Sequence, residues 1–221
     1  MQREIIETAD GSKTIYLPEW NEHYHSIHGA VQEANHVFIK NGLQSKTDDY
    51  LTILEMGFGT GLNALLTFFE SEKREQIIHY QSVEAYPILK NELEQMNFSD
   101  YSRDPRIIDI YQKMHKVAWN RACPISENFV IEKINSTIEQ LRLPVNSVDL
   151  CYYDAFGPRV QPELWTKDIF QNIYDWMDKD AVFVTYCAKG QVKRDLKAVG
   201  FLVETLQGPP GKREMIRAIK L

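Results

Sequence analysis

From residue 50 onward the sequence alternates short apolar runs with stretches of helical spacing, and this alternation restricts the fold more than any other feature. Apolar runs typical of buried strands lie at residues 51–56, 77–84, 128–132, 148–154 and 181–186. Helical stretches follow them at 61–74, 87–97, 134–143, 163–177 and 189–200. Repeated strand–helix units predict an α/β fold with a doubly wound, mostly parallel sheet. Two last runs, 201–207 and 213–221, share a short Gly-Pro-Pro-Gly link, so we expect them to pair antiparallel.

The first 49 residues have a different pattern. Short apolar runs within residues 4–17 flank Asp10-Gly11, a dipeptide that favours a tight hairpin turn. Residues 29–42 have helical spacing and end at Asn41-Gly42, a common helix stop. We therefore expect a small N-terminal extension, a hairpin and a helix, over residues 1–49. The α/β domain would then occupy residues 50–221.

The composition restricts where the protein acts. No run approaches the ~18 consecutive apolar residues of a membrane helix, and the polar first residues do not form a secretory signal. The three cysteines, Cys123, Cys151 and Cys187, are far apart and form no paired motif. This pattern predicts reduced thiols in a cytoplasmic protein without a membrane partner. It predicts nothing about the oligomeric state.

The charge is unevenly distributed. The chain has a net charge of −6, which by itself disfavours nucleic acid as a partner. Residues 186–221, however, contain eight lysines and arginines against three acids. Such a segment can present a basic face to phosphates, although solvated helix and strand faces explain the same count.

Three glycines, Gly57, Gly59 and Gly61, lie between the first strand of the α/β pattern and its helix. Glycines allow a sharp turn and the close approach of a ligand, and ligands of open α/β sheets bind at the carboxyl ends of the strands. Glu55 would repel a pyrophosphate but suits a cationic group, such as the amino group of S-adenosylmethionine. Glu84, after the second strand, is placed to accept both ribose hydroxyls. NAD binding, or a tight turn that binds nothing, are the alternatives.

An acid, Asp154, ends the run 148–154 at the same edge of the sheet. A carboxylate there could accept hydrogen bonds from an amine about to be methylated and take the proton that leaves. Phe156, Trp165 and Tyr186 could hold a planar base by stacking. Alternatively, Asp154 caps the following turn and Trp165 belongs to the core.

Five segments together resemble the MnmD/MnmC-type tRNA methyltransferase domain family. They are MGFGTGLN (56–63), YYDAFGPRVQPELWTKDIF (152–170), VTYCAKGQVKRDLKAVGF (184–201), GPPGKREM (208–215) and YHSIHGAVQEANHVFIKNG (24–42). The resemblance covers nearly the whole chain in the same order. It implies a Rossmann-like class I fold and methyl transfer from S-adenosylmethionine to 5-aminomethyl(-2-thio)uridine at the wobble position, in the anticodon region of tRNA. The product would be 5-methylaminomethyl(-2-thio)uridine.

The resemblance also assigns residues. A cofactor loop is implied at Gly57, Gly59, Gly61 and Asn63, and an active-site turn at Asp154, Phe156 and Pro158. The terminal signature falls on Lys212, Arg213, Glu214 and Met215. The expected substrate site consists of Phe156, Pro158, Arg159, Trp165, Tyr186, Lys212 and Arg213.

One position departs from the family pattern. Where the family often has Gly-Asp, this chain has Glu132-Lys133 before Ile134-Asn135. An aspartate there could accept a hydrogen bond from the adenine amino group, whereas Lys133 has no acceptor. We therefore expect adenine to be recognised by backbone groups, Asn135 or Glu132.

The chain stops after its last strand, without a segment for the flavin oxidase domain of MnmC-type proteins. It is therefore expected to methylate but not to remove a carboxymethyl group.

A metal site is an alternative reading of His23, His25, His28 and His36, but their spacing fits no zinc pattern and we predict no metal. Transfer to a small amine, as in aminopropyl transferases, and a non-catalytic adenosyl-binding module are the competing functions.

Overall fold

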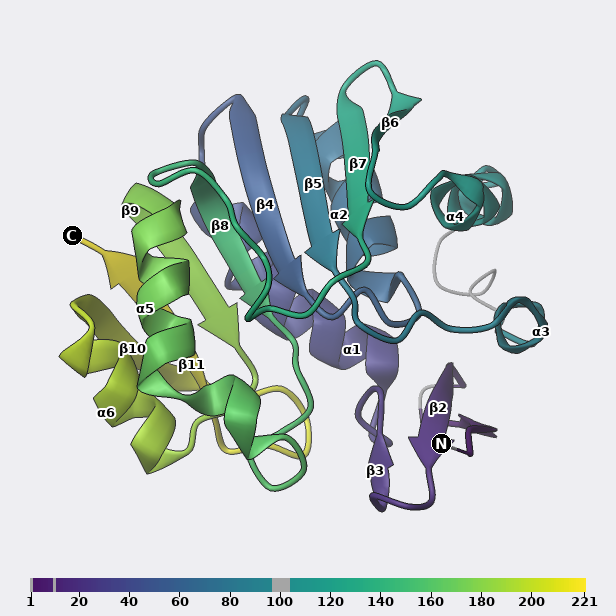
Figure 1. Cartoon of the computed structure of the whole chain (residues 1–221). Coiled ribbons are helices and arrows are strands. Elements are labelled where there is room, and N and C mark those ends of the chain that lie inside the picture. Colours follow the sequence, from purple (N-terminus) through teal and green to yellow (C-terminus); the bar gives the residue numbers. More distant parts are fainter. Residues whose placement is uncertain (1, 10, 97–103) are drawn as a thin grey trace.

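The computed structural model describes residues 2–9, 11–96 and 104–221. At its centre is an eight-stranded sheet with the strand order β10-β11-β9-β8-β4-β5-β7-β6 (Figure 1). Its strands are β4 (Tyr50–Met56), β5 (Ile77–Val83), β6 (Ala122–Ser126), β7 (Phe129–Ile134), β8 (Val148–Tyr153), β9 (Met177–Thr185), β10 (Phe201–Gln207) and β11 (Glu214–Lys220).

The five inner strands from β9 to β7 are mutually parallel, whereas β6, β11 and β10 pair antiparallel. This confirms the α/β class and the antiparallel pairing of the last two runs. The chain runs outward from β4 through β5 to β7, then returns to β8 on the other side of β4. The strand order therefore reverses between β4 and β8, the position where such sheets bind ligands.

Helices cover both faces of the sheet, because side chains of a buried strand alternate between the two faces. In β8, Leu150 and Tyr152 join one core and Cys151 and Tyr153 join the other. The first core lies against α1 (Ala30–Ala34), the π-helical segment η1 (Asn35–Lys40), α2 (Leu62–Lys73) and α4 (Ile107–Lys116). The second lies against α5 (Lys167–Trp176) and α6 (Gly190–Ala198).

The N-terminal residues form a second sheet of β1 (Glu4–Glu7), β2 (Lys13–Leu17) and β3 (Glu22–His23). The predicted hairpin is confirmed by the pairing of Glu4 with Tyr16 and of Glu7 with Lys13, while Asp10 of its turn lies outside the described residues. The predicted helix at 29–42 is present as α1 and η1, followed by the short η2 (Leu43–Ser45). It packs on the large sheet, where the rings of Phe38 and Tyr152 are 5.2 Å apart.

The predicted helix at 134–143 is absent. The structure has one turn there, closed by the amides of Gln140 and Leu141 on the carbonyl of Thr137. Asn135 is tied at both ends, since its amide donates to Asn120 Oδ1 and its side chain donates to the carbonyl of Glu84. These tertiary bonds hold the backbone extended, and only one turn fits before Pro144.

The predicted helix at 87–97 is reduced to α3 (Lys90–Leu93), with Asn97 outside the described residues. Arg3 from the N-terminal segment binds the carbonyls of Tyr86 and Pro87. These carbonyls would otherwise accept the first hydrogen bonds of a helix.

Two further differences concern proline and threonine. Strand β6 was not predicted because Pro124 lies within it, and a proline is tolerated there since β6 is an edge strand. The helix expected at 163–177 is divided into η4 (Pro162–Trp165) and α5, because Thr166 caps α5 by accepting from the amide of Ile169. Within the described residues, no helix combines the length and apolar character needed to cross a membrane.

Candidate active site

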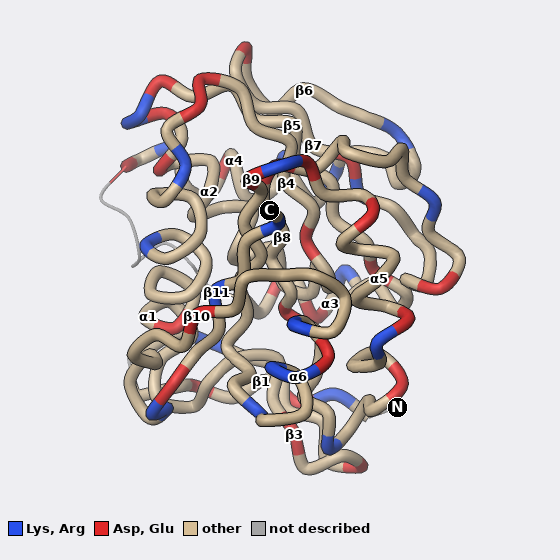
Figure 2. Tube along the Cα trace, turned by 90° about the vertical axis from the view of Figure 1, so that its left-hand side faces the viewer, with Lys and Arg blue, Asp and Glu red and all other residues tan. Residues whose placement is uncertain are grey.

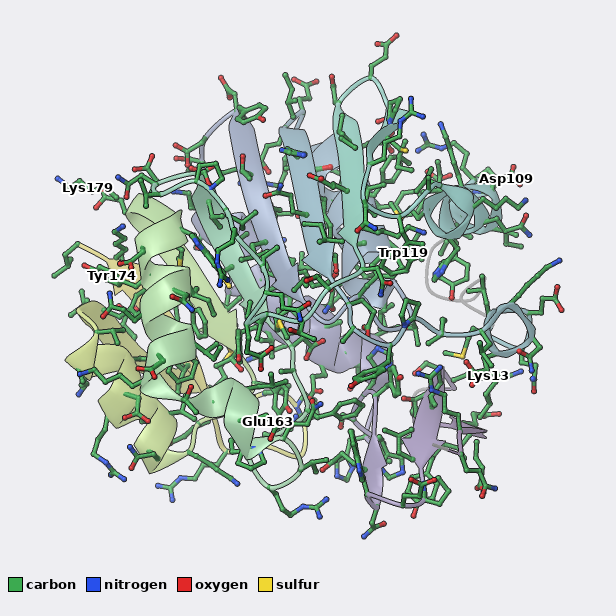
Figure 3. All side chains as sticks on the ribbon, viewed as in Figure 1. Lys13, Asp109, Trp119, Glu163, Tyr174 and Lys179 are labelled. Atoms are coloured by element: carbon green, nitrogen blue, oxygen red, sulfur yellow. The ribbon has the colours of Figure 1, made fainter. Side chains whose placement is uncertain are left out.

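A cavity of about 1030 Å³ lies at the carboxyl ends of the parallel strands, beside the point where the strand order reverses. One wall comes from the glycine loop and the ends of β5 and β8. The opposite wall comes from the N-terminal sheet, which lies below these strand ends in Figure 1, and includes Trp20 and Tyr24. Glu163, labelled in Figure 3, lines the rim from η4.

The glycine loop turns in a way that requires glycine. Gly57, Gly59 and Gly61 have φ values of 91°, 49° and 76°, a region that side chains with a Cβ disfavour. Gly57 and Gly59 line the cavity, whereas Gly61 faces the protein. A Cβ on Gly61 would lie 2.9 Å from Nε2 of His115.

His115 anchors the glycine loop on the side that faces the protein interior. Its Nε2 lies 3.0 Å from the carbonyl of Thr60, and because a carbonyl only accepts, the ring nitrogen must donate. Burial lowers the pKa of His115 to about 4, so the ring is neutral at physiological pH. The loop is thus anchored by a neutral donor rather than by an ion.

Glu84 follows β5 and contacts the same loop. Its carboxylate accepts from the amide of Gly59 at 3.0 Å and from the amide of Tyr86 at 2.8 Å. A carboxylate has about four acceptor positions, so two remain for a ligand. Glu84 lines the cavity, as expected from its place at a strand end.

Asp154 lies in the cavity wall immediately after β8. Its Oδ2 accepts from Nδ2 of Asn63, the second residue of α2, at 2.9 Å. Burial, and then the negative charge of Glu33, raise the pKa of Asp154 to about 8, against the opposing effects of Asn63 and Lys212. This carboxyl can therefore exchange a proton close to neutral pH.

Aromatic side chains form the part of the cavity wall next to Asp154. Phe156 meets the rings of Trp20 and Tyr24 edge-on, with centroids 5.5 and 5.1 Å apart. Tyr186 donates its hydroxyl to the carbonyl of Ala155. Phe156 and Tyr186 both line the cavity, where the sequence places them.

Lys212 enters the cavity from the loop between β10 and β11. Its ammonium lies 3.9 Å from the ring centroid of Tyr186 and forms an ion pair with Glu33 of α1. Glu33 was not predicted as a site residue, although it lies within the segment 24–42 that carries the family resemblance. The contact joins residues 179 positions apart, which no local pattern indicates.

Several expected site residues lie outside the cavity wall. Trp165 is 5% exposed and packs on Tyr153 and Phe170, so it belongs to the core. Its Nε1 still supports the active-site turn by donating to the carbonyl of Phe156. Neither Pro158 nor Arg213 lines the cavity.

Arg159 connects the active-site turn to the N-terminal sheet instead of lining the cavity. Its Nη2 donates to Glu22 Oε2 at 2.9 Å and to the carbonyls of Asn21 and Trp20. The tip of the N-terminal sheet and the Phe156–Arg159 turn are thereby held together.

Glu55 is placed beneath the cavity floor rather than in its wall. It is 1% exposed and accepts from Ser82 Oγ at 2.6 Å. Its side chain lies outside the cavity wall, and its contact with a cofactor amino group stays a prediction. Alternation along β4 explains the placement, because Glu55 shares a face with Leu51 and Ile53.

The residues expected to recognise adenine also lie outside the cavity wall. Asn135 is engaged with backbone groups, and Glu132 accepts from Gln81. Lys133 is buried beneath the glycine loop, where it donates to the carbonyl of His115 and lies 4.8 Å from the ring of Trp119. The residues that follow this segment in the chain and do line the cavity are Thr137, Ile138 and Glu139.

Of the four histidines near the N-terminus, three make separate side-chain contacts, and the backbone amide of His28 donates to Ser26 Oγ. His23 stacks on Tyr16, His25 contacts Thr14 and Thr60, and His36 contacts the carbonyl of Gln207. Over residues 2–9, 11–96 and 104–221, no three His, Cys, Asp or Glu side chains are grouped as metal ligands.

Comparison with known proteins shows related sequences. Residues 102–221 match the family described as S-adenosyl-L-methionine-dependent methyltransferase. A bifunctional protein of Burkholderia multivorans, named MnmC for tRNA 5-methylaminomethyl-2-thiouridine biosynthesis, is 30% identical over 92% of this chain and 33% of its own. A Burkholderia mallei protein of the same name is 29% identical over 96% of this chain and 34% of its own. The chain thus spans about a third of these relatives.

The fold also matches a solved structure. The crystal structure of MNMC2 from Aquifex aeolicus superposes with a TM-score of 0.80 and 25% sequence identity. The match covers 98% of this chain and 70% of that one. The N-terminal sheet is therefore included in the shared architecture.

Proposed function

Since this chain belongs to the S-adenosyl-L-methionine-dependent methyltransferase family, we propose that it methylates the primary amine of 5-aminomethyl(-2-thio)uridine at the wobble position of tRNA. The product is the 5-methylaminomethyl form. One observation carries the proposal: Asp154, a carboxyl able to exchange a proton near neutral pH, lies in the wall of a cavity beside the glycine loop.

The relatives support the choice of substrate. Those named for tRNA 5-methylaminomethyl-2-thiouridine biosynthesis match 92% or more of this chain. The match lies within about a third of their length, so it concerns one part of a bifunctional protein. The proposal assigns the methylation step to that part.

The residues present fit the cofactor. Gly57 and Gly59 themselves present no Cβ atom to the cavity, and the remaining acceptor positions of Glu84 suit the two ribose hydroxyls. We place adenine against Thr137, Ile138 and Glu139, because these residues line the cavity and directly follow the segment 132–135, where adenine recognition is expected. When bound, S-adenosylmethionine supplies a methyl group on a positively charged sulfur.

The residues around Asp154 suit an amine acceptor. The ionised carboxylate accepts hydrogen bonds from the neutral amine and directs its lone pair into the cavity. As the nitrogen gains its methyl group it becomes positively charged, and Asp154 takes the proton that it then loses. Phe156 and Tyr186 provide ring faces for the uracil base.

The tRNA backbone would bind beside the cavity mouth. Lys189 follows Tyr186 by three residues, and Arg213 is adjacent to Lys212. Both are exposed and form no ion pair among the described residues. Figure 2, which faces the side of α6, shows basic and acidic positions interspersed there. This arrangement supports a few local phosphate contacts rather than a broad basic face.

The direct test is methyl transfer from labelled S-adenosylmethionine to tRNA isolated from cells that lack this enzyme. Nucleoside analysis should find the label in 5-methylaminomethyl uridine. The Asp154→Asn variant should lose about 10²-fold or more of the rate while binding the cofactor normally. Unlabelled tRNA, with normal cofactor binding, would contradict the substrate and point to a small amine.

A further inference from the structure

Arg3, just before β1, joins the N-terminal sheet to the segment that follows β5. Its Nη1 donates to Oε2 of Glu92 at 2.9 Å, and its Nη2 donates to the carbonyl of Tyr86 at 2.9 Å. A longer contact of 3.4 Å joins Nη1 to the carbonyl of Pro87. The side chains of Arg3 and Glu92 are 13% and 11% exposed, so solvent screens this ion pair far less than a fully exposed one.

The backbone of Tyr86 connects Arg3 to the carboxylate of Glu84. The Tyr86 amide donates to Glu84 Oε1 at 2.8 Å, while the Tyr86 carbonyl accepts from Arg3. The other carboxylate oxygen, Glu84 Oε2, accepts from the amide of Gly59 in the glycine loop. One oxygen of Glu84 is therefore held by the loop, and the other by a residue that Arg3 fixes in place.

Tyr24, which follows β3, brings the N-terminal sheet against the glycine loop. Its amide donates to the carbonyl of Ile15 in β2, and a Cβ on Gly59 would lie 3.3 Å from Cδ1 of its ring. The guanidinium of Arg3 lies 5.9 Å from the centroid of the same ring. Arg3 thus contacts both the ring that covers the glycine loop and the segment 84–92, and all of these parts line the cavity.

We propose that Arg3 is a positioning residue for the cofactor. It holds the segment 84–92 against the N-terminal sheet, so that the free acceptor positions of Glu84 stay directed toward the ribose while Tyr24 stays over the glycine loop. A site that is already fixed loses less conformational freedom when its ligand binds. The contact of Glu84 with the ribose rests on the cofactor placement proposed above, whereas the hydrogen bonds of Arg3 do not.

Cofactor titration by calorimetry, with unfolding measured in parallel, separates positioning from a purely structural role. Arg3→Met removes the guanidinium donors, so the Kd for S-adenosylmethionine should rise about tenfold. It also leaves Glu92 without its cation, which lowers the free energy of unfolding. Adding Glu92→Gln removes that charge and keeps a side-chain oxygen for the amide of Leu89. Stability should then recover, but the Kd should not, because the Tyr86 carbonyl still lacks its donor.

Lys13→Met is the matched control. Lys13 (labelled in Figure 3) also joins the N-terminal sheet to the region of α3, because its Nζ donates to the carbonyl of Gln95 at 2.9 Å, but it does not line the cavity. The cofactor Kd of this variant should stay within about threefold of the parent value. A Kd that rises equally in Lys13→Met and Arg3→Met would indicate a general loosening of the N-terminal sheet and would overturn the proposal.

Glu84→Gln tests whether Arg3 acts through the ribose contact. Loss of the charged acceptor should weaken cofactor binding about tenfold. Adding Arg3→Met should then cost clearly less than it does in the parent, because the carboxylate that Arg3 positions is gone. Two fully additive losses would contradict the proposal, as would a Glu84→Gln variant with normal affinity. These titrations contain no tRNA, so unmethylated tRNA together with the expected Kd values would refute the proposed function and leave the role of Arg3 standing.

Two further results would overturn the role of Arg3. One is an Arg3→Met variant with the parent Kd, and the other is a double variant with Glu92→Gln whose affinity recovers together with its stability. Hydrogen exchange of the parent protein needs no variant at all. Binding of S-adenosylmethionine should slow exchange at the Tyr86 amide and in β1 together, because Arg3 couples them. Protection of Tyr86 with unchanged exchange in β1 would refute this coupling even if Arg3→Met fails to fold.

Discussion

The Asp154 carboxyl is subject to two opposing demands. To accept a proton in the proposed reaction it must be ionised, yet burial and the charge of Glu33 favour its neutral form. Lys212, paired with Glu33 and close to Asp154, acts in the opposite direction. The result is a carboxyl that titrates near the pH at which it has to work.

This balance predicts how stability depends on pH. Because the folded pKa of Asp154 lies above that of the unfolded chain, the folded protein binds the extra proton, and its stability falls as pH rises from about 4 to about 8. Asp154→Asn should remove that loss. Its gain in unfolding free energy over the parent should be on the order of 3 kcal/mol larger at pH 9 than at pH 5.5.

Thermal unfolding at the two pH values measures this difference. Asp175→Asn, an exposed carboxyl on α5, is the control and should show no comparable change. An equal effect of Asp154→Asn at both pH values would mean that Asp154 ionises as freely in the folded protein as in the unfolded chain.

The sequence predicted the location of individual candidate residues where a strand end determines it. Glu84 and Asp154 lie in the cavity wall because the carboxyl ends of parallel strands meet at one edge. Glu55 was placed by the same reasoning, but it lies one residue before its strand ends, and strand alternation turns it into the core. Glu33 and Lys212 depend on a contact across the whole chain, which local patterns do not reveal.

The glycine loop is held by its conformation and by its packing, and the two can be separated. Gly61→Ala introduces a Cβ 2.9 Å from His115 at a φ of 76°, and should cost about 1–3 kcal/mol. Cofactor affinity should fall with it, because the loop has to shift. Gly11→Ala is the matched control, since Gly11 has a φ of 82° but no atom within 4 Å of the added Cβ.

Chemical denaturation and cofactor titration of both variants test this prediction. Gly11→Ala should show only the conformational cost, about 1–2 kcal/mol, with an unchanged cofactor Kd. Equal stability and equal affinity of the two variants would mean that the contact with His115 does not constrain the loop.

The link between Arg159 and the tip of the N-terminal sheet should affect catalysis more than stability. The Arg159 side chain is 59% exposed, so Arg159→Ala should cost less than about 1 kcal/mol of unfolding free energy. Loss of the link loosens the Phe156–Arg159 turn, and kcat/KM for tRNA should fall about tenfold.

Arg106→Ala is the control for this variant, because Arg106 is similarly exposed and pairs with Glu72 and Asp104. Steady-state kinetics and thermal unfolding distinguish the two sites. If Arg159→Ala matches Arg106→Ala in kcat/KM, the link has no role in turnover.

Elements were predictable where periodicity and local stops agree, as in α2, α6 and the inner strands. They were not predictable where distant groups take over backbone hydrogen bonds. Arg3 occupies the carbonyls before α3, and Asn120 anchors Asn135 in place of a helix. In both cases a side chain far away in the sequence supplies the decisive bond.

At the scale of the whole molecule, Lys189 and Arg213, which are exposed and form no ion pair among the described residues, predict how tRNA binding responds to salt. tRNA affinity should fall linearly on a logarithmic scale with salt, and Lys189→Ala and Arg213→Ala should each reduce the slope by about 1. Lys179→Ala is the control, because Lys179 (labelled in Figure 3) lies near the amino end of β9, at the opposite edge of the sheet.

Equilibrium binding of tRNA across a salt series tests this surface. A slope that is unchanged in both variants would place the phosphates elsewhere. A slope reduced equally by Lys179→Ala would indicate binding without a preferred face.

The position of the N-terminal sheet has a practical consequence for handling the protein. Arg3 lines the cavity, so a peptide tag added at the N-terminus begins only a few residues along the chain from the cavity that the proposed tRNA base has to enter. The other terminus follows β11, which runs antiparallel to β9 and ends away from the cavity (Figure 1). Affinity tags, fluorophores and surface tethers are therefore best attached after Leu221, and kinetic comparisons between differently tagged preparations should take this asymmetry into account.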